Sequence, residues 1–138
     1  MLTFDQLDLD NLALVAWKEA RGDGNDAMLA IMHICLNRIS YPGFPTTLHE
    51  VIYQKNAFTS MSVSTDPEYN LEPKPGDIQY GFCEAQAPLA RTQPDITGGA
   101  HYYADLKYVT SGWFLRNIVN DPLHHPHTVK IGRQDFYV

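Results

Sequence analysis

The sequence is poor in cysteine and contains no long apolar run. Its two cysteines, Cys35 and Cys83, are too few for a disulfide framework and stand among apolar residues, so we expect small, free thiols in the core. No apolar stretch approaches the roughly 20 residues that a membrane-spanning helix needs. The first residues also lack the charged and then apolar pattern of an export signal. We therefore expect a chain made in the cytoplasm without a signal peptide and with no membrane insertion.

Positive charge is also scarce. The chain has 10 Lys and Arg against 16 Asp and Glu, which gives a net charge of −6 at pH 7, and its cations are scattered singly. A protein that binds the phosphate backbone needs cations gathered in a stripe or patch. The sequence therefore predicts no nucleic-acid partner.

The residues that are present predict one compact domain. A length of 138 residues is typical of a single domain, and 44% hydrophobic with 12% aromatic residues is ample for a core. We find no repeat or linker, so we expect one domain over residues 1–138. The sequence does not determine the oligomeric state, and a monomer is the default expectation.

The apolar pattern predicts mostly helices. Apolar residues recur at helical spacing over 9–21, after Asp8 or Asp10 as N-cap, and residues 26–39 are apolar nearly all round. A short helix around 48–53, capped by Thr46 or Thr47, and a helix over 77–91 that ends or kinks near Pro88 follow. Residues 66–76 read as a long loop, and residues 100–104, 128–131 and 136–138 as strand. The predicted class is α+β, mainly α, with a small antiparallel β element.

Glu19 is the first candidate for chemistry. It lies three residues before Gly22, in the last turn of an otherwise apolar helix. The carbonyl end of a helix carries partial negative charge, and apolar neighbours such as Trp17 disfavour ionisation, so both favour the protonated carboxyl. A carboxyl that keeps its proton near neutral pH can act as a general acid. On this motif alone, an exposed glutamate in a charged patch with Lys18 and Arg21 is the more ordinary interpretation.

Six short segments, taken in order, favour a functional role for Glu19 over this ordinary interpretation. The segments are EARGD (19–23), LNR (36–38), FPTTLHEVIYQ (44–54), AFTS (57–60), GGAHYYA (98–104) and IGRQDFY (131–137). Each segment is weak alone, but the order and spacing are specific. Together they resemble the cell wall hydrolase family of the spore-cortex-lytic enzyme SleB type, over most of the chain.

The resemblance implies a lysozyme-like fold and cleavage of peptidoglycan glycan strands between N-acetylmuramic acid and N-acetylglucosamine. It places the catalytic glutamate of the family on Glu19. It also implies the outcome of a lytic transglycosylase, in which one carboxyl protonates the leaving oxygen and then removes the proton from the muramic acid 6-hydroxyl. The implied product is a 1,6-anhydro sugar, and no cofactor is implied.

A hydrolytic muramidase remains the alternative outcome. A retaining glycosidase needs a second carboxylate about 5 Å from the acid, and an inverting one needs it roughly 6.5–9.5 Å away. No acidic residue stands in a setting that singles it out for this role, and turn or cap positions explain several of them equally well. The candidates are Asp23, Asp26, Asp66, Asp95 and Asp105.

Five residues are candidates for substrate binding. Thr59 and Ser60 occupy the place of a QFS-like segment in the family, so their hydroxyls are expected to orient the substrate or to hold Glu19; an ordinary polar loop is about equally plausible. Tyr102 and Tyr103 point to opposite faces if they lie on a strand, so one can enter a sugar groove, and parity does not say which. Phe58 is an aromatic candidate for the groove, although aromatic residues, Trp113 and Tyr137 included, fill cores more often.

The histidines and Arg38 have more ordinary interpretations. His124, His125 and His127 cannot all reach one metal ion from a normal backbone, and no CxxC or HExxH accompanies them, so we expect an exposed loop and no metal site. A zinc amidase that uses these histidines would be inhibited by chelators. His33 is expected to be a core histidine. Arg38 ends a helix, where a cation suits the helix dipole, so we expect a structural role.

Three departures from the family pattern concern the substrate contacts rather than the fold. Asp23 replaces a glutamate of EARGE, AFTS lacks the glutamine of QFS, and Gln134 stands where a histidine is frequent. The export signal and wall-binding repeats of many relatives are also missing from the sequence. We therefore expect a phage or prophage endolysin that is released by a holin or carried in a virion. A wall-binding or virion protein that has lost turnover is a further alternative.

Overall fold

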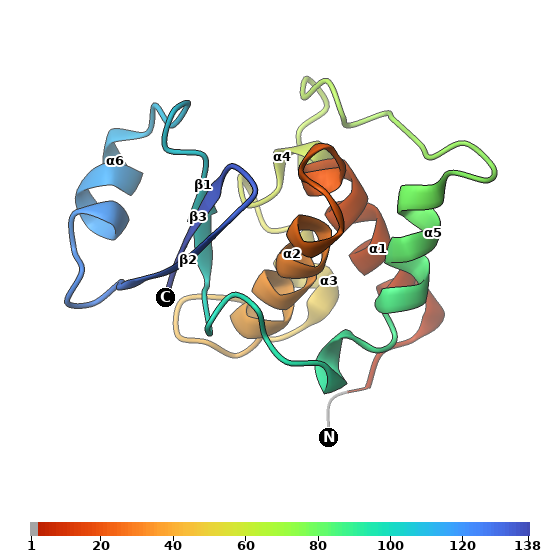
Figure 1. The fold of residues 1–138 in the computed structure, drawn as a ribbon, viewed down its shortest axis with the longest axis horizontal. Helices are drawn as coiled ribbons and strands as arrows, with labels where there is room; N and C mark the ends of the chain where they lie inside the picture. Colours follow the sequence, from red (N-terminus) through yellow and green to blue (C-terminus); the bar gives the residue numbers. More distant parts are fainter. Residues whose placement is uncertain (1–2) are drawn as a thin grey trace.

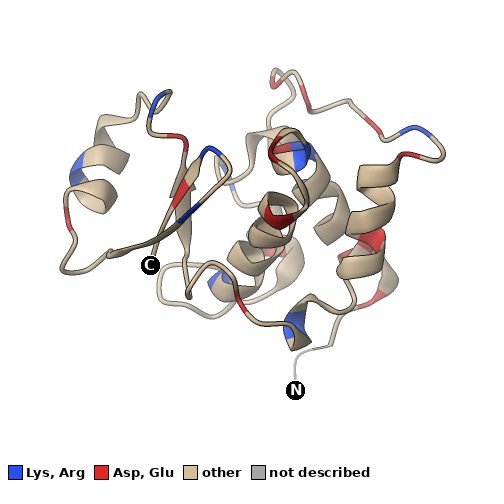
Figure 2. Ribbon diagram, viewed as in Figure 1, with Lys and Arg blue, Asp and Glu red and all other residues tan. Residues whose placement is uncertain are grey.

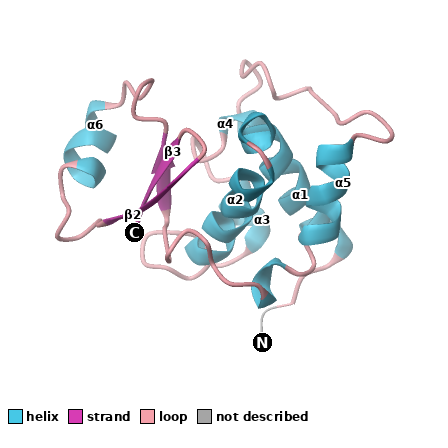
Figure 3. Cartoon of the chain, in the orientation of Figure 1, coloured by secondary structure: helices cyan, strands magenta, loops and turns pink. Residues whose placement is uncertain are grey.

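The computed structural model describes residues 3–138, and they form a helical part and a smaller β part (Figure 1). The helical part contains α1 (Gln6–Ala20), α2 (Asn25–Arg38), α3 (Leu48–Ile52), α4 (Thr59–Ser62) and α5 (Ile78–Gln86). The β part contains β1 (Tyr102–Ala104), β2 (His127–Ile131) and β3 (Gln134–Tyr137), with α6 (Gly112–Phe114) beside them. Short η1 (Arg21–Asp23), η2 (Ala90–Thr92) and η3 (Leu115–Val119) complete the chain (Figure 3). The predicted class, α+β and mainly α with a small antiparallel sheet, is confirmed.

The first helix begins one turn earlier than its apolar pattern indicates. Asp5 is the N-cap: its carboxylate accepts from the Asp8 backbone N–H at 2.8 Å, and the Asp8 carboxylate accepts from the Asp5 N–H at 3.1 Å. This reciprocal capping box satisfies two N–H groups of the first turn. The expected caps at Asp8 or Asp10 are therefore wrong. Leu7 is 62% exposed, so the first turn buries little apolar surface, and its sequence therefore shows no apolar residues at helical spacing.

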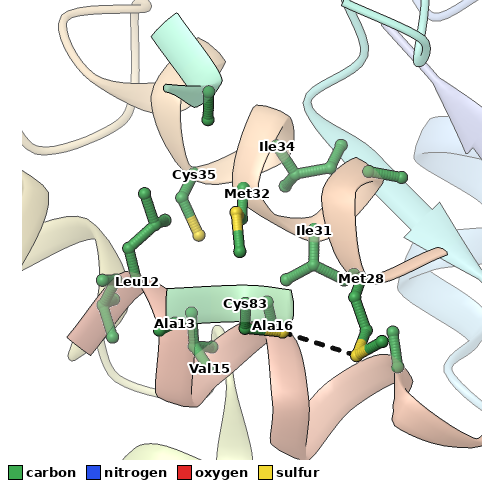
Figure 4. Close-up of a cluster of buried hydrophobic side chains, with 14 of the residues drawn as sticks. Leu12, Ala13, Val15, Ala16, Met28, Ile31, Met32, Ile34, Cys35 and Cys83 are labelled. Carbon is green, nitrogen blue, oxygen red and sulfur yellow. Dashed lines mark hydrogen bonds between the residues drawn. The ribbon is translucent and has the colours of Figure 1, made fainter. Parts of the chain in front are cut away.

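The core lies between α1, α2 and α5 (Figure 4). The second helix is buried on most of its surface, as its nearly continuous apolar sequence predicted. Cys35 and Cys83 are both free and buried, as expected, and the Cys83 thiol donates to the Met28 sulfur at 3.4 Å. Burial raises the pKa of each thiol to about 12, so both remain protonated packing groups.

Most other expected elements are present. Thr47 caps α3, and α5 begins after its N-cap Asp77 and ends before Pro88. Residues 66–76 contain no helix or strand, which confirms the long loop. Three elements were not expected from the sequence: α4, which is a single turn of four residues within the polar residues 55–64, and α6 with the η3 that directly follows it.

The sheet has the order β1-β3-β2, and both pairs are antiparallel. Tyr103 pairs with Phe136, and a register shift separates His127 from Val129 on β2. His127 therefore belongs to a strand, and the expectation of a loop through residue 127 is wrong by one residue. The turn between β2 and β3 forces Gly132 to a φ of 59°, and a Cβ there would lie 2.9 Å from the Asp23 Cβ, so this hairpin sits directly against η1.

Charges are distributed over both parts, and no element of residues 3–138 carries a continuous row of cations (Figure 2). Within the same residues, no helix combines the length and apolar character that crossing a bilayer requires.

Candidate active site

Glu19 lies where the helical part meets the sheet. It is in the last turn of α1, as predicted, and its side chain is half-buried. The Ser60 hydroxyl donates to Glu19 Oε2 at 2.6 Å, and the Tyr103 hydroxyl donates to Oε1 at 2.6 Å. These three residues come from α1, α4 and β1, and 84 positions separate Glu19 from Tyr103. The fold thus holds one carboxyl group by a hydroxyl on each oxygen.

Tyr103 is a permanent donor in this arrangement. Burial, with the neighbouring Glu19 charge adding to it, raises the pKa of Tyr103 well above its usual value of 10. Its ring packs against Phe58 and Phe136 at centroid distances of 6.4 and 5.9 Å. The phenol therefore keeps its proton and its position, and it presents an O–H to Glu19 over the whole neutral range.

Ser60 is also held by Lys18, which the sequence suggested only as a member of an exposed charged patch and which is buried in the structure. Ser60 is 1% exposed, and its backbone carbonyl accepts from Lys18 Nζ at 3.1 Å. Lys18 also donates to the Tyr69 carbonyl at 2.8 Å, and burial lowers its pKa. One buried cation thus joins α1 to α4 and to the 66–76 loop. The available signal was a lysine next to Glu19 at a position that continues the buried face of the helix.

The structure separates the five expected contact residues. Ser60 holds Glu19, whereas the adjacent Thr59 is exposed and donates to Asp66 at 2.6 Å. Phe58 is 0% exposed, so the expected direct sugar contact is wrong: this ring supports Tyr103 from within the core. Tyr102 and Tyr103 both border a groove beside this centre, and only Tyr103 bonds to Glu19.

A groove of about 610 Å³ adjoins this centre through Tyr103. Trp113, which is 57% exposed, forms part of its wall, whereas Tyr137 is buried. The groove is concave, aromatic and edged by amides, which suits the apolar faces and hydroxyls of sugars. Its lining residues are Arg38, Gly43, Phe44, Gln54, Lys55, Asn56, Ala57, Tyr102, Tyr103, Trp113 and Phe114.

Arg38 has the structural role expected of it, and it also faces the groove. Its Nε donates to the His101 carbonyl at 2.8 Å, which ties the end of α2 to the residue before β1. Its guanidinium carbon lies 4.9 Å from the Phe44 ring centre and 5.1 Å from that of Phe58. Burial lowers the pKa of Arg38, although a guanidinium stays charged at any physiological pH.

The other candidate carboxylates have bonds of their own. Asp23 pairs with Arg133 at 2.8 Å, Asp66 accepts from Thr59, and Asp95 accepts from Asn37 and Thr97. Asp105 accepts from the Lys107 backbone at 3.1 Å, and Asp26 is exposed at the start of α2. Within residues 3–138, no carboxylate is hydrogen-bonded to Glu19, so Glu19 is not one half of a bonded carboxyl pair.

The histidines that stand together in sequence are directed to separate partners. His124 pairs with Asp121, His125 contacts the Val138 carbonyl at 2.8 Å, and His127 pairs with Asp135. His33 is buried against the Ala90 carbonyl at 3.0 Å, as expected of a core histidine. Across residues 3–138, no group of three or more His, Cys, Asp or Glu side chains is placed to hold a metal ion.

Comparisons with known proteins agree with this architecture. The chain is 32% identical over 110 residues to a spore cortex-lytic enzyme of Oceanobacillus iheyensis, which covers 80% of the chain and 37% of that enzyme. It is 36% identical over 95 residues to a spore cortex-lytic enzyme of Bacillus subtilis, covering 67% of the chain and 31% of that enzyme. The chain thus spans well under half the length of these curated relatives.

Solved structures extend the likeness to the whole chain. The catalytic domain of the germination-specific lytic transglycosylase SleB from Bacillus anthracis superposes with a TM-score of 0.75 at 26% identity, covering 100% of this chain and 99% of that one. The catalytic domain of the Bacillus cereus SleB protein gives the same TM-score and identity and is covered over 94% of its length. Both alignments therefore include α1 with Glu19.

The family model that matches the sequence is described as Cell Wall Hydrolase, and it covers residues 22–137. Its range begins three residues after Glu19, so the family model itself does not include Glu19. The resemblance read from the six sequence segments is confirmed, and the chain belongs to the cell wall hydrolase family.

Proposed function

We propose that this chain cleaves peptidoglycan glycan strands between N-acetylmuramic acid and N-acetylglucosamine, as a lytic transglycosylase with Glu19 as its acid and base. The observation that carries the proposal is a single half-buried carboxyl group, held by two hydroxyls beside an aromatic groove. The name of the solved Bacillus anthracis relative, the catalytic domain of a germination-specific lytic transglycosylase, supports the same reaction.

The proposed reaction uses Glu19 twice. Protonated Glu19 first gives its proton to the oxygen that links C1 of the muramyl residue to the leaving N-acetylglucosamine, and the C1–O bond breaks. The resulting carboxylate then takes the proton from the muramyl 6-hydroxyl as that oxygen bonds to C1. The products are a 1,6-anhydromuramyl end and a free sugar hydroxyl, and Glu19 regains its proton.

Ser60 and Tyr103 suit the intermediate stage of this cycle. Both hydroxyls can donate to the carboxylate that forms once Glu19 has given up its proton. They also fix both oxygens, and so the direction from which the proton is delivered. The name of the solved Bacillus anthracis relative, a lytic transglycosylase, favours an attacking group supplied by the substrate over a paired-carboxylate hydrolysis.

The deciding experiment compares wild type with Glu19→Gln on purified peptidoglycan. Glutamine keeps the shape and cannot donate the acid proton, so we expect cleavage to fall by at least about 10²-fold. Glu84→Gln is the matched control, because Glu84 is exposed on α5 away from the groove, and it should cleave like wild type. Normal cleavage by Glu19→Gln would overturn the assignment and favour a binding protein without turnover or a different enzyme.

Mass spectrometry of the products separates the two enzymatic outcomes. Anhydro ends lack one water relative to the reducing ends that a hydrolytic muramidase leaves. Reducing ends alone would replace the transglycosylase proposal with the muramidase alternative. Cortex and vegetative walls should be digested in parallel, because the relatives are named for spore cortex. The phage or prophage setting and release by a holin stay predictions.

A further inference from the structure

The groove is positive, although the chain as a whole is acidic. Its lining includes two cations, Arg38 and Lys55, and no aspartate or glutamate. The complete sequence, by contrast, has 16 acidic and 10 basic residues. A groove that only held neutral sugars would have no need of this bias, so its lining points to a ligand with an anionic group.

Arg38 is the buried cation of this lining. It is 7% exposed, and within residues 3–138 its one hydrogen-bond acceptor is the His101 carbonyl, which bonds to Nε. The two terminal nitrogens of the guanidinium have no acceptor among these residues, and no carboxylate forms an ion pair with it. Arg21 and Arg133, which are more exposed, pair with Glu68 and Asp23.

This arrangement leaves N–H groups of Arg38 at the wall of the groove without a hydrogen-bond acceptor in residues 3–138, although the charge of Glu19 acts on the guanidinium. A buried charge is costly unless it is paired and hydrogen-bonded. The rings of Phe44, Phe58 and Tyr102, at 4.9 to 6.0 Å, compensate part of the cost through cation–π contacts, but they accept no conventional hydrogen bond. Because Arg38 lines the groove, a ligand in the groove can supply the missing acceptor.

The free edge of a guanidinium fits a carboxylate with two parallel hydrogen bonds. Of the two sugars in a peptidoglycan strand, only muramic acid carries a carboxylate, on its 3-O-lactyl group, when no peptide is attached. Arg38 is deeply buried, so a short substituent on the sugar ring suits it better than a long peptide, while Phe44 and Tyr102 offer aromatic surface beside it. Tyr103 lines the same groove and bonds to Glu19, which keeps this muramyl residue next to the acid.

We propose that Arg38 binds the lactyl carboxylate of a muramyl residue, so that this protein prefers glycan strands whose muramyl residues have lost their peptides. The proposal rests on the proposed function, because it concerns the substrate of the same groove. It assigns Arg38 to substrate recognition and leaves proton transfer to Glu19.

The test measures binding of peptide-free tetrasaccharides of alternating N-acetylglucosamine and N-acetylmuramic acid. One ligand has free lactyl carboxylates, and the other has the same carboxylates as methyl esters. Binding to Glu19→Gln, which prevents turnover, is followed by calorimetry or by the fluorescence of exposed Trp113 in the groove. We expect the ester to bind at least about tenfold more weakly, which is typical for loss of a charge-assisted hydrogen bond.

Arg38 variants identify the residue responsible. Arg38→Gln should bind the acid and the ester equally. Arg38→Lys should keep part of the preference for the acid, because lysine keeps the positive charge but cannot form the two parallel hydrogen bonds of a guanidinium. Arg116→Gln is the matched control, because Arg116 is exposed and outside the groove lining, and it should keep the full preference. If Arg38→Gln does not fold, the binding of the acid and of the ester is compared in the protein that keeps Arg38 and in Arg38→Lys. This comparison then decides whether Arg38 recognises the carboxylate.

Two results would overturn the proposal: equal binding of acid and ester when Arg38 is present, or an unchanged preference in the folded Arg38→Gln protein. Failure of the proposed function would be separate from either. In that case the wild-type protein would not cleave peptidoglycan, whereas the binding measurement uses no turnover and still reports whether Arg38 recognises the carboxylate.

Discussion

The helical and β parts of the molecule are built differently. In the helical part, α1 and α2 bury large apolar side chains almost completely, including Leu12, Met28 and Ile31. The β part has a much smaller set of buried apolar residues, and it exposes Tyr108 at 64% and Trp113 at 57%. All three residues of β1 are only half-buried. The helical part therefore supplies a stable support, and the β part supplies aromatic surface.

The candidate active site needs both parts. Glu19 belongs to the helical part and Tyr103 to the sheet, and specific hydrogen bonds keep the two in register. At the end of α2, Asn37 donates to the Ala100 carbonyl at 3.0 Å, and Arg38 donates to the His101 carbonyl at 2.8 Å. The difference shows that apolar packing sets the position of α1, which carries Glu19, whereas hydrogen bonds join the helical part to the sheet that carries Tyr103.

The largest expected effect tests whether apolar packing in the helical part carries most of the stability. Leu12→Ala removes a side chain that is 0% exposed in the helical core, and it should lower the free energy of unfolding by about 2–5 kcal/mol. Ile118→Ala, at 1% exposure in the β part, should cost less, because fewer buried neighbours surround that site. Denaturant unfolding of both variants checks this. A larger loss for Ile118→Ala would show that the β part carries the stability.

The second effect tests the polar half through activity. Tyr103→Phe and Ser60→Ala each remove one hydroxyl from Glu19, and each should lower kcat roughly tenfold, within the range of hydrogen bonds to charged groups. KM should change little, because the sugar groove remains. Steady-state kinetics on peptidoglycan checks both values.

Thr59→Ala is the matched control for this second prediction. Its hydroxyl is one residue from Ser60 but bonds to Asp66, so kcat should stay near the wild-type value. An equal loss of kcat in Thr59→Ala and Ser60→Ala would contradict the specific role of Ser60 and indicate a general disturbance of α4.

The contrast between apolar packing in the helical part and hydrogen bonds between the two parts also explains which features could be predicted from the sequence. Apolar periodicity is local, so the two long helices, the long loop and the strands near the C-terminus could be predicted. Glu19 was identified because it ends such a helix and opens a family-like segment. The start of α1 was placed too late, because the Asp5 and Asp8 capping box carries no apolar signal.

The contacts between the parts were harder to predict, because they join residues far apart in sequence. Parity on a strand did not choose between Tyr102 and Tyr103; in the structure both border the groove, and only Tyr103 bonds to Glu19. Phe58 was expected at the sugar surface, but it lies in the core, since aromatic composition does not tell the two environments apart. Lys18 was missed because its partners are backbone carbonyls of Ser60 and Tyr69, which no sequence pattern reveals.

A third, smaller effect concerns the loop that leads into β1. Asp95 accepts from Asn37 at 2.8 Å and from the Thr97 hydroxyl at 2.6 Å. Burial works to raise the pKa of Asp95, but the hydrogen bonds from Thr97 and Asn37 outweigh it, and the pKa lies below its ordinary value. A depressed pKa in the folded state stabilises the protein above the unfolded value of about 3.9, and this stabilisation is lost as pH falls through the folded value.

Asp95→Asn should therefore be less stable than wild type at neutral pH. The two should converge only as pH falls below the unfolded value of about 3.9 and through the lower folded pKa, where wild-type Asp95 also becomes neutral. Thermal unfolding between acidic and neutral pH checks the convergence. Asp26→Asn, at an exposed site on α2, is the control and should show no such pH-dependent difference of comparable size. A constant gap at all pH values would mean that the charge of Asp95 is not what holds the loop.

The smallest expected effect concerns the ion pair that joins the β2–β3 turn to η1, which follows α1. Arg133 Nε donates to Asp23 at 2.8 Å, but the Arg133 side chain is 67% exposed. Exposed pairs contribute little, and salt screens them, so Arg133→Ala should lower the melting temperature slightly in dilute buffer and not measurably at about 1 M salt. Since Asp23 is only 7% exposed, a large loss that persists in high salt would instead mean that this contact, and not only the Asn37 and Arg38 bonds, holds the two parts together.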